Sequence, residues 1–392
     1  PLLDIRQRCR LADAGDGGRD FGGAEDGRGS REFRRHPELD PWAPDAVRNW
    51  SLYSFDYTHP EVREHQFAMF RELAERYDAD GIELDWMRQP WCLTAGKEAE
   101  QAYILTDFMR RARKLADAVA KRRGHPVGVC VRVPSLLAGA RLMGYDIETW
   151  VKEGLVDIIV PTSAYSAAEY DFGVADWRRA LGGAAHPVKL VFGTDCCIYN
   201  HAVERFDVYA DNFSFFRGWA ANAADGDGYY IFNAPYYREP ARSALYSGAL
   251  APELVAHGSR RYPITYHEWT PTKAMADNQM LRRSIGEGGE FHLNVRKYPH
   301  DRSFVLIFGV DRKDDPPLTL TLNGVSPEEP PRAVSPKCVV PNPAGFVTNP
   351  LGLGRAWAWK FPPDVIRDGR NSVVIAPTKT EARAVWCEIM VK

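Results

Sequence analysis

Two acidic residues, Glu83 and Asp85, end a short run of strand-forming residues. Side chains of a β-strand alternate between its two faces, so both carboxylates lie on one face. Ile82, Leu84 and Trp86 are apolar and lie on the other face. A pair of carboxylates supplies an acid and a base or nucleophile when their surroundings separate their pKa values. The segment therefore predicts a catalytic site that rests on two carboxylates.

The elements that position this pair alternate in type between residue 49 and about residue 250. Strands are predicted at residues 50–55, 81–86, 127–133, 156–162, 188–194 and 228–233. Helices are predicted at residues 60–77, 98–123, 146–153, 174–181 and 203–223. Such alternation is typical of an α/β fold with a parallel sheet. The spacing favours a closed (β/α)8 TIM-like barrel over an open doubly wound sheet, and such barrels hold their active sites at the carboxyl ends of the strands.

The N-terminal part of the barrel departs from this pattern. A further strand is predicted at residues 2–6, which gives seven strands, one short of eight. Either the first strand was lost with the N-terminus or it is irregular. Residues 9–48 are rich in Gly, Asp and Arg and show little periodicity. They are expected to form a long loop at the catalytic face.

The C-terminal part has a different character. After about residue 258, turns and prolines separate strand-like runs at residues 289–295, 304–309, 318–323, 355–361, 372–376 and 384–391. Short strands with frequent turns are typical of an all-β module, and a sandwich is expected. The predicted domains are therefore a barrel at residues 1–258 and an accessory β-sandwich at residues 259–392.

The same alternation places other polar residues on the inner face of the barrel. Arg132 falls opposite a row of valines, Asp195 follows the end of a predicted strand, and Asn233 ends the last one. A functional role for Arg132 has a structural alternative. It could form a buried ion pair with Asp85 or Glu83 on the neighbouring strand.

Composition argues against several classes of function. The formal net charge of −2 at pH 7 gives no general attraction to nucleic acid or anionic membranes. No stretch approaches the ~20 apolar residues of a membrane span. The seven cysteines include no CxxC pair, and no HExxH, calcium-loop, dinucleotide-binding or Walker pattern occurs. We therefore expect no metal and no cofactor. Removal of a signal peptide ahead of Pro1 would make the protein secreted or periplasmic.

Three segments carry a likeness to a known family. Residues 54–63 read SFDYTHPEVR, residues 76–88 read RYDADGIELDWMR, and residues 222–233 end in ADGDGYYIFN. Over roughly residues 30–240 the chain resembles bacterial glycoside-hydrolase-like TIM barrels. The resemblance implies an enzyme that hydrolyses O-glycosyl bonds of an oligo- or polysaccharide. Residues 9–29 depart from what the family leads us to expect.

This resemblance implies roles for the inner-face residues. Asp85 or Glu83 would be one catalytic carboxylate and Asp195 the other. Retention of the anomeric configuration needs carboxyl groups about 5–5.5 Å apart and inversion about 6.5–9.5 Å, and the sequence leaves both open. The residues expected to line the sugar site are Trp86, Arg88, Arg132, Tyr165, Tyr199, His201 and Asn233.

Two other functions fit the same residues. A barrel without a regular first strand suits a carbohydrate-binding protein that has no catalytic activity. A polysaccharide lyase would use Tyr165, Tyr199 or His201 as its base and Arg132 to neutralise a uronate. An intact bound sugar would favour the first function, and an unsaturated product that absorbs in the ultraviolet would favour the second.

Overall fold

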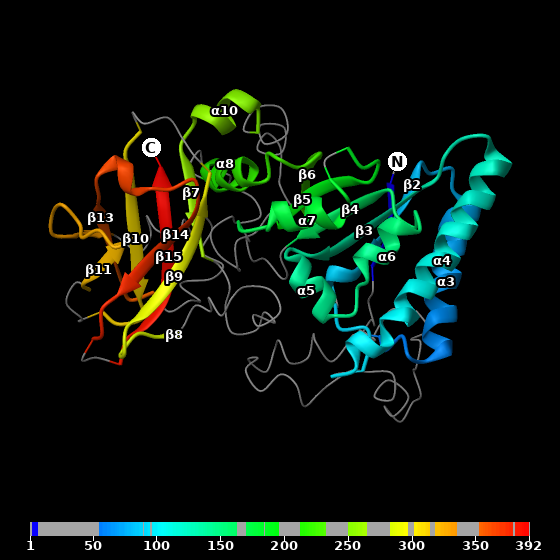
Figure 1. The fold of residues 1–392 in the computed structure, drawn as a ribbon, viewed down its shortest axis with the longest axis horizontal. Coiled ribbons are helices and arrows are strands. Elements are labelled where there is room, and N and C mark those ends of the chain that lie inside the picture. The colour runs from blue at the N-terminus through cyan, green and yellow to red at the C-terminus, as the bar shows by residue number, and fades with distance from the viewer. Residues whose placement is uncertain are drawn as a thin grey trace, which may run out of the picture. The chain divides into compact units, whose positions relative to one another are not determined.

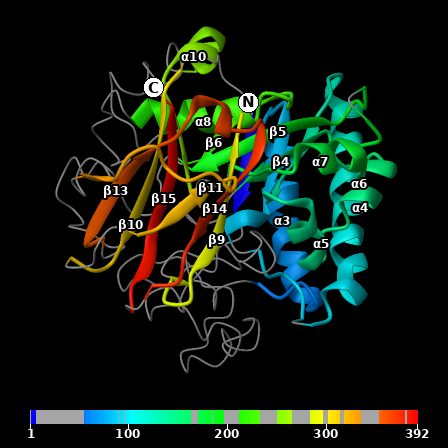
Figure 2. The ribbon, with the colours of Figure 1, turned by 60° about the vertical axis from the view of Figure 1, so that its left-hand side comes forward.

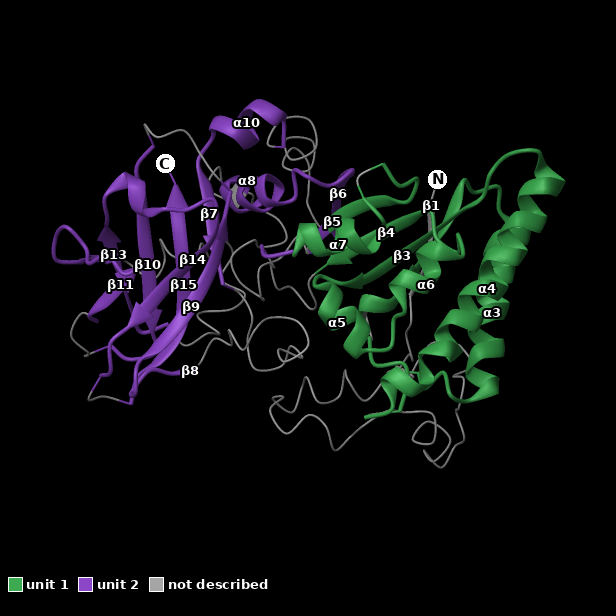
Figure 3. Ribbon diagram, viewed as in Figure 1, with its two compact units in different colours: residues 1–164, 173–192, 273–275 green, residues 165–172, 193–272, 276–392 purple. Residues whose placement is uncertain are grey.

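The computed structural model describes residues 2–6, 55–88, 90–94, 96–162, 170–183, 185–195, 212–232, 250–264, 283–296, 302–313, 318–334, 353–378 and 381–391. The chain forms two compact units (Figure 3). Unit 1 comprises residues 1–164, 173–192 and 273–275, and unit 2 comprises residues 165–172, 193–272 and 276–392. The domain boundary expected at residue 258 stays a prediction.

The first sheet is α/β in character, with strands in the order β1-β2-β3-β4-β5-β6 (Figure 1). The pairs β1–β2, β2–β3 and β3–β4 are parallel. The strands are β1 (Leu2–Arg6), β2 (Gly81–Asp85), β3 (Gly128–Pro134), β4 (Ile158–Thr162), β5 (Lys189–Asp195) and β6 (Gly228–Phe232). The predicted strands at these positions are confirmed, while closure into a full barrel stays a prediction.

One expectation about strand order is wrong. A barrel built in chain order would place a strand at residues 50–55 between the first strand and the one that carries Glu83. Instead β1 pairs directly with β2, with Leu2 opposite Gly81 and Arg6 opposite Asp85. Direct pairing leaves no room for another strand between them. Residues 50–54 lie outside the described residues.

Helices of unit 1 follow the strands as predicted, with two additions. They are α3 (Pro60–Arg76), η1 (Trp86–Arg88), α4 (Glu98–Arg123), α5 (Leu137–Leu142), α6 (Ile147–Lys152) and α7 (Val174–Ala180). The proline that begins α3 suits the first helical turn, where its missing N–H costs nothing. Helix α4 ends where Gly124 adopts a φ of 81°, a left-handed conformation that favours glycine. The short helices η1 and α5 were not predicted.

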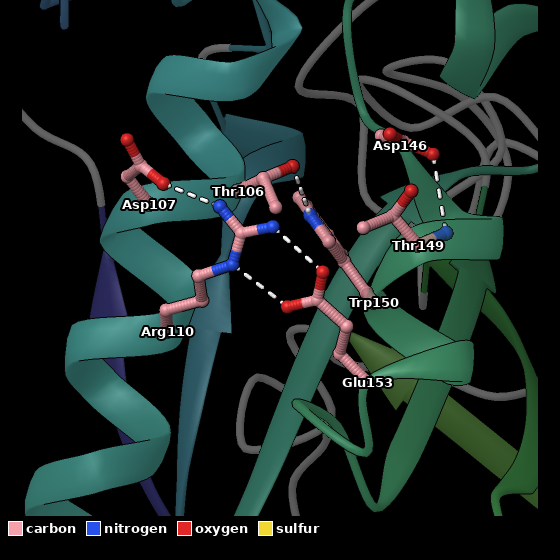
Figure 4. Close-up of polar contacts among 7 residues, drawn as sticks. All are labelled: Thr106, Asp107, Arg110, Asp146, Thr149, Trp150 and Glu153. Atoms are coloured by element: carbon pink, nitrogen blue, oxygen red, sulfur yellow. Dashed lines mark hydrogen bonds and ion pairs between the residues drawn. The ribbon is translucent and has the colours of Figure 1, made fainter.

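Helices α4 and α6 are joined by a buried hydrogen bond and an exposed ion pair (Figure 4). The indole of Trp150 donates to Oγ1 of Thr106 at 3.0 Å, and both residues are buried. Arg110 donates to both carboxylate oxygens of Glu153 at 2.6 and 2.7 Å. Because exposed ion pairs contribute little to stability, the buried bond is expected to matter more.

Thr106→Val is expected to lower the free energy of unfolding by about 1–3 kcal/mol, because the buried N–H of Trp150 loses its acceptor. Denaturant unfolding of the purified protein measures this. The matched control is Asp107→Asn on the same helix, which removes only an exposed partner of Arg110 and should leave the unfolding curve almost unchanged. Equal effects of the two substitutions would contradict the prediction.

Unit 2 contains two antiparallel sheets (Figure 2). The larger has the order β12-β13-β10-β15-β7 with β8 beside β15, and the smaller has the order β11-β14-β9. Besides β6, the elements of unit 2 are α8 (Asn212–Asn222), α10 (Pro252–His257), β7 (Arg260–Pro263), β8 (Arg283–Ser284), β9 (Gly289–Val295), β10 (Phe304–Val310), β11 (Leu320–Leu322), β12 (Arg332–Val334), β13 (Arg355–Lys360), η4 (Pro363–Val365), β14 (Gly369–Ile375) and β15 (Arg383–Val391). After residue 258 the described elements are strands apart from η4, as predicted, and the sandwich stays a prediction.

Two features of these sheets involve buried side chains. Trp357 and Trp359 on β13 are each only 2% exposed, so they pack in the core and form no open platform for a sugar. Arg261 of β7 and Glu388 of β15 form a buried ion pair at 2.7 Å. The guanidinium of Arg261 also lies 4.1 Å from the ring centroid of Phe215 in α8. This cluster ties α8 to the larger sheet, and no single-strand pattern in the sequence indicated it.

Candidate active site

The candidate site lies on three neighbouring strands of unit 1. The register pairs Glu83 with Cys130 and Asp85 with Arg132 across β2 and β3. Residues that are register partners in a parallel sheet point to the same face. On β4, Val160 is the register partner of Arg132. Thr162 lies two residues further along the same strand, so it shares this face. Glu83, Asp85 and Arg132 therefore share one face of the sheet, as strand alternation predicted. Thr162, which was not among the predicted residues, lies on the same face.

Asp85 is held by a buried ion pair. Its Oδ1 accepts a hydrogen bond from Nε of Arg132 at 2.7 Å, and its Oδ2 accepts one from Nη2 at 3.1 Å. The backbone N–H of Met87 donates to Oδ1 at 3.0 Å. Asp85 is 0% and Arg132 3% exposed. A guanidinium presents its N–H groups in a planar fork that matches a carboxylate, so this two-pronged contact fixes the orientation of the Asp85 side chain.

Glu83 lies one row deeper on the same face and has a different neighbour. The thiol of Cys130 donates to Oε2 of Glu83 over 3.6 Å, and both residues are 1% exposed. A thiol is a weak donor and carries no charge when protonated. The printed contacts of the two carboxylates of β2 thus differ in kind, since Arg132 engages Asp85 and the thiol of Cys130 donates to Glu83.

Trp86 lies on the opposite side of β2, within the helix-facing core. Its ring is fully buried and lies 5.3 Å from Tyr57, 5.7 Å from Tyr145, 6.1 Å from Phe108 and 6.4 Å from Trp150, measured between ring centroids. Strand alternation already assigned Trp86 to this side. The structure thus gives it a packing position behind the site.

The other expected site residues are only partly described. Arg88 ends η1 and Asp195 ends β5, and for both the structure describes the backbone alone. Four expected sugar-site residues lie outside the described residues, namely Tyr165, Tyr199, His201 and Asn233. The carboxylate separation that distinguishes retention from inversion therefore stays a matter of prediction.

Cys130 and Thr162 were missing from the expected site. Both could have been found by continuing the inner-face alternation from Arg132 along β3 and on to β4. Cys130 is buried and forms no disulfide bond. Two further register partners come from β1, where Asp4 stands opposite Glu83 and Arg6 opposite Asp85.

Within the described residues, no group of three or more His, Cys, Asp or Glu side chains is arranged to hold a metal ion. None of the helices that the structure describes is both long and apolar enough to cross a membrane.

No protein-family model matches the chain, and no curated protein matches it. Among solved structures it is similar to a family GH18 chitinase from Chromobacterium violaceum, with 11% identity over 85% of this chain and 68% of that chain and a TM-score of 0.33. It is also similar to a β-porphyranase of glycoside hydrolase family 86 from Bacteroides plebeius, with 10% identity, coverage of 83% and 81%, and a TM-score of 0.30.

A third similar structure is BuGH86 in complex with neoagarooctaose, with 12% identity over 34% of this chain and a TM-score of 0.22. The chain spans only 18% of the length of that protein. These neighbours are glycoside hydrolases by name, but all three TM-scores lie below 0.5. The likeness therefore carries no argument about the activity of this chain.

Proposed function

We propose that the chain is a glycoside hydrolase that cleaves an oligo- or polysaccharide, with Glu83 as the catalytic carboxylate of β2. The supporting observation is the pair of carboxylates on one face of β2, next to Arg132 on β3. Arg132 engages both oxygens of Asp85, and the thiol of Cys130 donates to Glu83. Two neighbouring carboxylates are the arrangement by which enzymes combine an ionised group with a proton donor.

Asp85 then has a supporting role in this proposal. Its ion pair with Arg132 holds both side chains in place on the same face as Glu83, two residues further along β2. The second catalytic carboxylate is proposed to be Asp195, which ends β5. Substrate contacts are proposed for the residues that follow the strand ends, namely Arg88, Tyr165, Tyr199, His201 and Asn233.

One observation favours a second candidate function, a carbohydrate-binding protein without turnover. Glu83 and Asp85 are almost entirely buried, so neither presents its carboxylate to solvent. Closure around a substrate is one explanation, and a purely structural role for both residues is the other. The polysaccharide lyase loses support, because Arg132 is committed to Asp85 and is not positioned to neutralise a uronate.

Incubation with a panel of neutral and acidic oligosaccharides tests the proposal. New reducing ends identify a hydrolase, and an unsaturated product that absorbs in the ultraviolet identifies a lyase. Nuclear magnetic resonance of the first anomer released distinguishes retention from inversion. Tight binding with no product across the whole panel would support the binding protein and overturn the hydrolase.

A further inference from the structure

Thr162 carries a polar atom that the fold leaves without a partner. Its side chain is fully buried, and Oγ1 has no hydrogen-bond partner among the residues that the structure describes. Buried hydroxyl groups in folded proteins nearly always have a partner, because a lost hydrogen bond to water must be replaced. An unpaired one therefore calls for a physical reason.

The position of Thr162 suggests that reason. It is the last residue of β4, and it lies on the same face as the Asp85–Arg132 pair. It stands two residues beyond the register partner of Arg132, toward the carboxyl end of the strand. Ligands of parallel α/β sheets bind at the carboxyl ends of the strands. The hydroxyl therefore lies at the end of the sheet where ligands of such folds bind.

Packing alone does not account for a threonine here. Threonine favours strands through its branched side chain, but valine has the same shape and no hydroxyl to bury. Other buried unpaired atoms in the described residues belong to the indole rings of Trp86, Trp219 and Trp386, or to the long helix side chains of Gln66, Arg113 and Arg123. A ring gains enough from burial to offset one unpaired N–H. Thr162 has no comparable apolar bulk.

We propose that Oγ1 of Thr162 hydrogen-bonds a hydroxyl group of the carbohydrate, which extends the substrate site from β2 across to β4. A threonine hydroxyl donates one hydrogen bond and accepts two, which matches a sugar hydroxyl that also does both. A neutral group of this kind suits an uncharged sugar unit better than a uronate or a sulfate. Arg132 does not alter this preference, because Asp85 engages its guanidinium. The inference rests on the proposed function.

Thr162→Val tests the inference with two readouts. In the Glu83→Gln background, calorimetry with an oligosaccharide that the wild type hydrolyses should show a Kd raised by about 3- to 10-fold, the effect of losing one hydrogen bond. Thr162→Ser keeps the hydroxyl and should bind almost as the parent does. Without ligand, Thr162→Val should raise Tm, because it removes a buried hydroxyl that has no partner.

The matched control is Thr106→Val, the same substitution at a buried threonine whose oxygen accepts a hydrogen bond from Trp150. It should lower Tm and leave Kd unchanged. An unchanged Kd for Thr162→Val, with an active wild type, would overturn the inference and leave the proposed function intact. A lowered Tm for Thr162→Val would also overturn it, since the hydroxyl would then be satisfied by the protein itself. A wild type that neither binds nor cleaves any sugar of the panel would overturn both.

Discussion

Replacing Glu83 by Gln is expected to lower kcat by about 10²–10⁴-fold, the usual contribution of a side chain that transfers a proton in the transition state. Glutamine keeps the shape of the side chain and can still accept a hydrogen bond from Cys130. The Kd for the intact oligosaccharide should therefore change little. Reducing-end assays under saturating substrate measure kcat, and calorimetry with the same substrate measures Kd.

Two further variants make this result specific. Glu64→Gln on α3 removes an exposed carboxylate whose partner is Arg111 on α4, and kcat should be unaffected. Asp85→Asn removes the charge opposite Arg132, so its main effect should be on stability. If Asp85→Asn abolished kcat in a fully folded protein while Glu83→Gln remained active, the assignment of the two carboxylates would have to be reversed.

The sequence predicted individual elements well where the information is local. Residues 98–123 form a helix with the predicted bounds, because the apolar periodicity continues for the whole length and Gly124 ends it. Strand β2 differs from its prediction only at its last residue. The alternation within β2 and β3 also placed Glu83, Asp85 and Arg132 on one face, since a strand fixes this by its own geometry.

Features that depend on how strands pair could not be predicted in this way. The choice of Asp85 as the partner of Arg132 follows from the register between β2 and β3, which neither strand specifies alone. The same holds for β1, whose direct pairing with β2 replaced an expected intervening strand. The unpaired hydroxyl of Thr162 is a property of its surroundings, and a threonine in a strand pattern gives no sign of it.

The ion pair between Arg132 and Asp85 leads to the largest expected effect on stability. Arg132→Met keeps much of the side-chain length but removes the guanidinium that engages both oxygens of the buried Asp85 carboxylate. Breaking one partner of a buried ion pair typically costs about 3–5 kcal/mol, because the remaining charge is uncompensated. Guanidinium unfolding should therefore show a much lower midpoint for this variant, with an unchanged slope.

A double variant separates the value of the ion pair from the cost of breaking it. Arg132→Met combined with Asp85→Leu fills the same space with apolar groups, and replacing a buried pair as a whole is often neutral or stabilising. Most of the lost stability should therefore return, although the N–H of Met87 also loses an acceptor. The exposed control is Arg110→Met, whose ion pairs lie at the surface and whose unfolding midpoint should barely move. If Arg132→Met unfolded at the same denaturant concentration as the wild type, the pair would not hold Asp85 in place, and the distinction between the two carboxylates would lose its physical basis.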